Sequence, residues 1–314
     1  MGLERLLGNE QLKKNLRISV EKGKVSHFYL ISGPAGSGKR TLARLLSAAI
    51  LCQSGEKPCL SCNACRKVMG EVHPDCITVT DPEHKAVAVK IVRDARADMY
   101  IRPNEGSRKI YIFPQELGIE GQNALLKILE EPPPYGVFIL LSDNPEKLLP
   151  TVRSRCTELR LLSLSEPVLR QALQQEFPDA DKESLDSAIL RSGGYLGQAK
   201  QLLENGAMSP QTEGFANAFA KRDHLGLLQV LCSMEKWKRD QAITEWQSWL
   251  QLLQTALIAQ TGNLPAPAQA KLLQSSRSPG ELMRAIGVLQ EIIPFAQGNV
   301  SVAAICGHLQ WALR

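Results

Sequence analysis

The chain has 314 residues, 44% hydrophobic and 22% charged, a composition that excludes an intrinsically disordered protein and gives room for two or three domains. Its net charge of +5 permits contact with nucleic acid but does not require it. No apolar run reaches the roughly 18 residues of a membrane span and the N-terminal stretch lacks an apolar signal core, so we expect a cytoplasmic protein.

Short β-rich runs alternate with helical patterns in the first half of the chain. The predicted strands cover residues 28–32, 76–80, 109–113, 137–142 and 156–161. Continuous apolar strands of this kind are buried on both faces, which is typical of a parallel sheet covered by helices. The pattern therefore predicts an α/β domain over residues 1–161.

A glycine-rich loop follows the first predicted strand and opens a helix, which is the context that a phosphate-binding loop requires. Its backbone and lysine would surround phosphates. The next residue should carry a hydroxyl for magnesium, but Arg40 stands there, and a residue one step further along a helix is rotated by about 100°. The candidate, degenerate nucleotide-binding residues are Gly33, Gly36, Gly38, Lys39 and Thr41.

A working ATPase also needs acidic residues at the end of an apolar strand, to hold magnesium and orient water. The strand 109–113 ends instead in Pro114–Gln115, and Glu116 lies beyond the strand tip. Two losses in one metal site argue against hydrolysis by this chain. ATP or ADP binding without turnover stays open and is not required.

Four cysteines lie close together, in an arrangement that points to metal before disulfide in a cytosolic chain. Cys52, Cys59, Cys62 and Cys65 could close a tetrahedral thiolate site, which favours a structural Zn²⁺. An iron–sulfur cluster, a redox pair and free buried thiols are the alternatives. The scattered cysteines are interpreted as small core residues, and they are Cys76, Cys156, Cys232 and Cys306.

Strand signals fade after residue 161. Short amphipathic helices are predicted over 162–207, with a break at Gly193–Gly194, and an all-helical segment with leucines and tryptophans at helical spacing over 208–314. The sequence thus predicts three parts.

Several motifs then follow in a fixed order: the glycine loop, the four-cysteine insert, "HPD" (73–75), "NALLKILEEPP" (123–133) and "LLPTVRSRC" (148–156). This order resembles the bacterial DNA polymerase III clamp loader, an AAA+ assembly. The resemblance covers about residues 4–205 motif by motif and is looser beyond. It implies an AAA+ core with an inserted zinc module at about 52–65, a small helical lid and an all-α collar that joins subunits.

Clamp-loader subunits are of different kinds, and the resemblance implies which kind this chain is. Motor subunits of the gamma/tau type keep the full ATPase set, whereas a second kind keeps the fold and loses much of the ATP site. Arg40, Pro114–Gln115 and Gly197, which stands where motor subunits carry a nucleotide-sensing arginine, fit the second kind. Implied partners are motor and delta subunits in a hetero-oligomeric ring and, through the complex, the sliding clamp and primer–template DNA.

In this family the arginine of "SRC" reaches into the neighbouring subunit's ATP site. Arg155 is therefore the candidate catalytic residue, acting in trans as an arginine finger. As a lone arginine it would more often cap a strand or pair with a local carboxylate. Arg153 is two residues away, and on a strand both side chains would point to one face.

Two other functions are compatible with parts of this sequence. One is an active motor ATPase of the same family, and another is a zinc-dependent nucleic-acid-binding module with a vestigial ATPase core. Arg93 and Arg96, three apart on one predicted helix face, could follow a DNA backbone but are more often a solvated surface. The mild net charge argues against tight DNA binding by the monomer.

Overall fold

The structure is a computed structural model that describes residues 2–84, 86–204, 208–261, 267–297 and 300–313. The chain forms two compact units, one of Met1–Ala172 with Gly194–Gln198 and the other of Leu173–Gly193 with Ala199–Arg314. The predicted boundary at 207–208 adjoins residues 205–207, which lie outside the described residues. The predicted three-part division stays a prediction.

A five-stranded parallel sheet forms the centre of the first unit within the described residues, as the sequence predicts, with strand order β2–β4–β6–β1–β7. Its strands are β1 (Phe28–Ser32), β2 (Cys76–Thr78), β4 (Lys109–Phe113), β6 (Gly136–Ser142) and β7 (Thr157–Arg160). A separate parallel pair consists of β3 (Ala86–Val87) and β5 (Glu116–Leu117). The predicted strand positions are confirmed, with ends that shift by one or two residues.

The three inner strands are buried along their whole length, which explains their continuous apolar sequences. Their side chains alternate between the two faces of the sheet. On β1, Phe28 and Leu30 belong to the core on one face, and Tyr29 and Ile31 to the core on the other.

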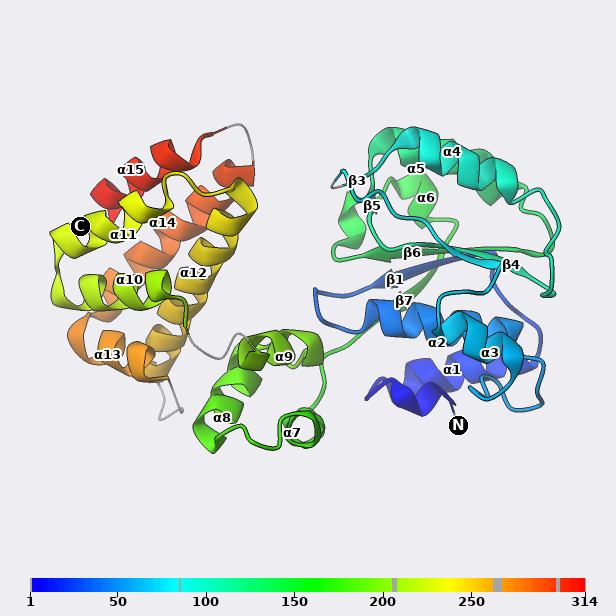
Figure 1. Cartoon of the computed structure of the whole chain (residues 1–314), viewed down its shortest axis with the longest axis horizontal. Coiled ribbons are helices and arrows are strands. Elements are labelled where there is room, and N and C mark those ends of the chain that lie inside the picture. The colour runs from blue at the N-terminus through cyan, green and yellow to red at the C-terminus, as the bar shows by residue number, and fades with distance from the viewer. Residues whose placement is uncertain (1, 85, 205–207, 262–266, 298–299, 314) are drawn as a thin grey trace. The chain divides into compact units, whose positions relative to one another are not determined.

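Helices cover both faces of this sheet (Figure 1). One layer contains α1 (Glu10–Glu21), α2 (Lys39–Leu51) and α3 (Asn63–Met69). The other contains α4 (Val89–Asp98), α5 (Ile119–Glu130) and α6 (Pro150–Arg153). The described residues of this unit also include two 3-10 helices, η1 (Gly2–Arg5) and η2 (Pro145–Lys147).

The "HPD" motif explains how the loop before β4 is held. Asp75 is fully buried, and its carboxylate accepts hydrogen bonds from the backbone N–H groups of Asn104, Glu105 and Gly106 at 2.6, 2.8 and 2.7 Å. The Nδ1 atom of His73 accepts a hydrogen bond from the Asp75 backbone N–H at 3.0 Å. Burial alone would raise the pKa of Asp75, but these N–H groups outweigh it and lower the pKa below its ordinary value.

The region after β7 is helical, as predicted. Its helices are α7 (Glu166–Glu176), α8 (Lys182–Arg191), α9 (Leu196–Glu204), α10 (Pro210–Lys221), α11 (His224–Met234), α12 (Arg239–Thr261), α13 (Ala268–Ser276), α14 (Pro279–Gln297) and α15 (Val302–Ala312). The predicted break at Gly193–Gly194 separates α8 from α9, and both glycines have positive φ. No described helix combines the length and apolar character needed to cross a membrane.

Apolar side chains of α10 to α15 form one core in the second unit. Trp246 and Trp249 are fully buried in it, and Phe215 stacks on Trp249 with ring centroids 4.3 Å apart. Trp311 is 74% exposed, so the four tryptophans are not equivalent. The prediction that all scattered cysteines are core residues is wrong for Cys232, which is exposed because it lies on the outer side of α11.

We predict that Asp75→Asn lowers the free energy of unfolding by about 2–3 kcal/mol at pH 7, because N–H groups would lose a charged acceptor. The lowered folded-state pKa means that the carboxylate stabilises the fold above the ordinary value of 3.8, and that this contribution disappears as the pH falls through the folded-state pKa. Urea unfolding of both proteins at several pH values should therefore show a difference that shrinks in acid. Asp94→Asn, on the exposed side of α4, is the control, and an equal loss in it would contradict the prediction.

Candidate nucleotide, metal and arginine sites

The phosphate loop joins β1 to α2, as the sequence predicts. Gly38 is the N-cap of α2, and Lys39 is the first helical residue. Gly36 and Gly38 have φ values of 75° and 94°, in the left-handed region that favours glycine. Gly33 is buried at the end of β1, where its N–H donates to the Ser142 carbonyl at 3.2 Å. The loop thus has the backbone that its sequence requires.

The ammonium group of Lys39 is already paired within the chain. It donates to the carbonyl oxygens of Gly33 and Pro34 at 2.6 and 2.8 Å, and it forms an ion pair of 2.5 Å with Oδ1 of Asp143. The Lys39 side chain is 12% exposed, whereas the Asp143 side chain is 60% exposed. Asp143 directly follows β6, the neighbour of β1 in the sheet. The Asp143 carboxylate therefore contacts the ammonium group of Lys39, the group that binds phosphate in a phosphate loop.

A distant segment of the first unit also contacts this loop. The backbone N–H of Gly197 donates to the Gly36 carbonyl at 2.9 Å, and Nε2 of Gln198 donates to the Ala35 carbonyl at 2.9 Å. A Cβ added at Gly197 would lie 2.7 Å from the Cα of Gly36, a separation that real side chains essentially never show. Close packing against Gly36 therefore requires glycine at position 197. An arginine would not fit at this position without a shift of the backbone.

The residues around the loop do not rebuild a magnesium site. Arg40 and Thr41 are both exposed on the first turn of α2. Gln115 takes the strand-tip position, where its side-chain amide donates to the carbonyls of Asp81 and His84 at 2.9 and 3.0 Å. The carboxylate of Glu116 pairs with Lys147 at 2.7 Å. These polar groups are used to hold surrounding loops.

The four predicted cysteine ligands converge. Their sulfur atoms all lie within 4.8 Å of one another, and Cys52–Cys59, Cys52–Cys62 and Cys59–Cys65 are separated by 3.6, 4.0 and 3.9 Å. A tetrahedron with Zn–S bonds of about 2.3 Å has sulfur–sulfur edges of about 3.8 Å. The cluster fits a four-coordinate zinc ion, which would fasten the 52–65 loop and leave no open coordination position.

Hydrogen bonds orient the sulfur atoms of this cluster. The backbone N–H groups of Cys62 and Cys65 donate to the sulfurs of Cys59 and Cys62 at 3.3 and 3.4 Å. In the metal-free cluster, donors from Ser61 and the backbone lower the pKa of the Cys59 thiol to about 5, whereas burial raises that of Cys65. A thiolate is the form that binds metal.

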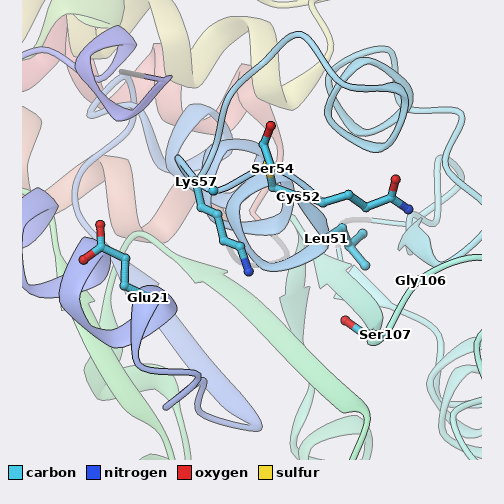
Figure 2. Close-up of a pocket in the computed structure, with 9 residues that line it drawn as sticks. Glu21, Leu51, Cys52, Ser54, Lys57, Gly106 and Ser107 are labelled. Atoms are coloured by element: carbon cyan, nitrogen blue, oxygen red, sulfur yellow. The ribbon is translucent and has the colours of Figure 1, made fainter.

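An open pocket of about 760 Å³ lies beside the cysteine loop. Figure 2 shows Lys57 and Cys52 of this loop around the pocket, with Glu21 at the end of α1 and Ser107 at other parts of its rim. The sequence gives no signal for it. Of the four cluster cysteines, Cys52 lines this pocket.

Arg155 lies in the turn between α6 and β7, and Arg153 is the last residue of α6, so neither is on a strand. The condition under which both side chains would share one strand face is therefore not met. Arg155 donates to the Thr151 carbonyl at 2.9 Å and pairs with Glu130 at 2.9 Å, whereas Arg153 pairs with Glu146 at 2.6 Å. The two arginines therefore have different ion-pair partners, Glu130 at the end of α5 and Glu146 in η2.

Sheet topology places Arg155 and the phosphate loop at opposite ends of two neighbouring strands. β1 and β7 are parallel neighbours, with Tyr29 opposite Thr157 and Ser32 opposite Arg160. Arg155 precedes β7 and the loop follows β1. The four-residue length of β7, about 13 Å along the strand direction, therefore separates Arg155 from the phosphate loop. The structure thus brings together the predicted residues of the phosphate loop, and separately the four predicted cysteine ligands. Arg155 lies apart from the phosphate loop.

Sequence reasoning missed Asp143 and Glu130. The available signal for Asp143 was its place at the carboxyl end of a predicted strand, since the carboxyl ends of parallel strands meet at one edge. Glu130 lies inside a quoted motif, but nothing in the sequence pairs it with Arg155. Of the two candidate DNA-contacting arginines, Arg96 donates to the Ala124 carbonyl at 3.0 Å and Arg93 is exposed on α4.

We predict that the purified chain carries one zinc ion and that Cys59→Ser loses most of it and melts roughly 5 °C or more lower, because a structural zinc contributes directly to folding. Metal analysis and thermal unfolding, with and without a chelator, measure both effects. Cys232→Ser is the matched control, since this cysteine is exposed and lies outside the cluster. A metal-free wild-type protein with unchanged stability in chelator would contradict the zinc assignment.

Two relatives of this chain are subunits of DNA polymerase III. The chain is 34% identical over 194 residues to the DNA polymerase III subunit delta' of Pseudomonas aeruginosa, covering 60% of this chain and 59% of that protein. It is 30% identical over 210 residues to the DNA polymerase III subunit gamma of Buchnera aphidicola, covering 64% and 57%. The matches thus span less than two thirds of those relatives.

A solved structure supports the fold. The gamma subunit-related protein of DNA polymerase III from Thermotoga maritima aligns over 97% of this chain and all of its own, with a TM-score of 0.51 at 18% identity. The sequence profile of the family described as "DNA polymerase III, delta subunit" matches residues 8–165, from α1 through β7. The chain therefore belongs to this family of AAA+ clamp-loader subunits of DNA polymerase III.

Proposed function

We propose that this chain is the delta-prime-type subunit of a bacterial DNA polymerase III clamp loader. It takes part in loading the sliding clamp onto primed DNA in the cytoplasm, without hydrolysing ATP itself. Its partners are motor subunits of the gamma/tau type and a delta subunit in one hetero-oligomeric ring. The helical collar holds it in that ring, and the zinc ion stabilises the inserted module.

One observation carries this proposal. The Lys39 ammonium is paired with the chain's own Asp143, while Arg155 lies at the opposite edge of the sheet. Hydrolysis needs a lysine that reaches phosphate, a magnesium ligand and a group that orients water. Arg40 and Gln115 stand at the two positions where the magnesium side chains would be. The geometry thus favours a subunit that contributes to catalysis only outside its own phosphate loop.

Arg155 is the residue that we assign to this contribution. Because it cannot approach its own phosphate loop across the sheet, the ATP that it serves is a neighbouring subunit's. Its ion pair with Glu130 is solvent-exposed, and such pairs contribute about 1 kcal/mol or less, so the side chain can exchange Glu130 for phosphate at little cost. A planar guanidinium then neutralises charge that develops on the transferred phosphoryl group.

An active gamma/tau-type motor is the second candidate. The retained glycine loop with Lys39 favours it, as does the 30% identity to a gamma subunit. Such a motor would hydrolyse ATP with magnesium as an isolated chain, and Lys39→Ala would abolish that activity.

We predict that the isolated chain does not hydrolyse ATP, and that adding motor subunit, delta subunit, clamp and primed DNA gives an active mixture. Arg155→Ala should reduce turnover of the mixture by about 10³-fold or more, in the range known for arginine fingers. Arg153→Ala is the control two residues away and should leave most of the turnover. Hydrolysis by the isolated chain, or equal losses in both variants, would refute the assignment.

A further inference from the structure

The retained phosphate loop raises the question of what Lys39 does. A lysine ammonium has three N–H donors. In this loop three oxygen atoms surround it, the carbonyls of Gly33 and Pro34 and the carboxylate of Asp143. The ammonium has one partner for each donor, and one of these partners carries a full negative charge. The cation is thus fully engaged by the chain itself.

We propose that Asp143 is the built-in counter-ion of Lys39 and that it excludes nucleotide phosphates from the loop. The proposal rests on the proposed function and deepens it, since it names the residue that keeps this subunit free of nucleotide. A β- or γ-phosphate can reach Lys39 only after the 2.5 Å ion pair opens. The freed carboxylate would then face the polyphosphate, and like charges a few ångströms apart repel. Asp143 therefore opposes phosphate binding both by holding the lysine and by its charge.

The Gly194–Gln198 segment supports the conformation of the loop. It is fastened to the loop by the hydrogen bonds from Gly197 to Gly36 and from Gln198 to Ala35. At its start, the Gly194 carbonyl accepts from the Leu164 N–H at 2.8 Å, which ties the segment to the connection between β7 and α7. These bonds join the segment directly to the loop.

The loop nevertheless keeps the means to bind phosphate once the carboxylate charge is removed. Gly36 and Gly38 hold the left-handed backbone of a phosphate loop, and Lys39 opens α2, whose N-terminus favours anions. The Ser37 hydroxyl is buried and has no hydrogen-bond partner. A single neutral substitution at position 143 should therefore reveal a binding site.

Calorimetric titration of the full chain with MgADP and with MgATP tests the proposal. The wild type should bind with a Kd weaker than about 1 mM, and Asp143→Asn should tighten binding by about tenfold or more. The gain should vanish in the double variant Asp143→Asn with Lys39→Ala, since it requires the freed ammonium. Asp94→Asn, which removes an exposed carboxylate on α4, should bind as weakly as the wild type.

Two results would overturn the proposal: micromolar binding by the wild type, or no gain in Asp143→Asn when zinc content and thermal unfolding show a native fold. Both are binding results and are independent of turnover. Loss of the Arg155 effect in the clamp-loader mixture would refute the proposed function while leaving the binding comparison intact. Tight wild-type binding without hydrolysis would refute the role of Asp143 and leave the in-trans role of Arg155 standing.

Amide hydrogen exchange gives a second readout that does not need nucleotide. Gly197→Ala introduces a Cβ that would contact the Gly36 backbone, so the amides of residues 33–38 should exchange at least several-fold faster than in the wild type. Gly280→Ala, at a position where a Cβ meets nothing within 4 Å, is the matched control. Unchanged exchange in Gly197→Ala would show that the segment does not hold the loop.

Discussion

Parallel pairing of β1 between β6 and β7 is the constraint on which the sites depend. All five residues of β1 are buried, and burial of each large apolar side chain stabilises the fold by about 1.5–3 kcal/mol. A shift of this strand by one residue would turn Phe28 and Leu30 to the wrong face. The register is therefore strongly specified. It also fixes the positions of the loops that begin and end at these strands. Phosphate loop and Asp143 meet at one edge, while Arg155 lies at the other.

Charge neutralisation explains most of the polar architecture in the first unit. Lys39 is held by Asp143, and the buried carboxylate of Asp75 is held by three backbone N–H groups. In each case a group with little access to water has a partner inside the chain, because an unpaired charge there would be costly. Arg155 differs from Lys39 on the cation side: the Lys39 side chain is 12% exposed and has two carbonyl partners besides the exposed Asp143 carboxylate, whereas Arg155 is 37% exposed and its pair with Glu130 is solvated on both sides. The difference in burial of the two cations underlies the different roles that we propose for them.

The loop that carries the four cysteines, residues 52–65, needs a different kind of stabilisation. The loop between α2 and α3 has few apolar side chains of its own, and the buried Cys52 and Cys65 anchor it at the helix ends. Four converging thiolates could hold such a loop through a zinc ion where a hydrophobic core is too small to do so. With all four positions filled by cysteine, such a site would have a structural task and would be separate from the groups at the strand ends.

The sequence by itself determined the strand positions, the helical second half, the phosphate loop and the cysteine ligands, because each depends on local periodicity or on short spacings along the chain. It also identified the family through motif order, and it made Arg155 a candidate whose role stays a prediction. Only the tertiary structure decided that Asp143 pairs with Lys39, that Gly197 packs on Gly36, and that Arg155 rests on Glu130 at the far edge of the sheet. These partners are 25 to 161 residues apart. Strand order and the close approach of backbones bring them together, and neither follows from the pattern of residues along one segment.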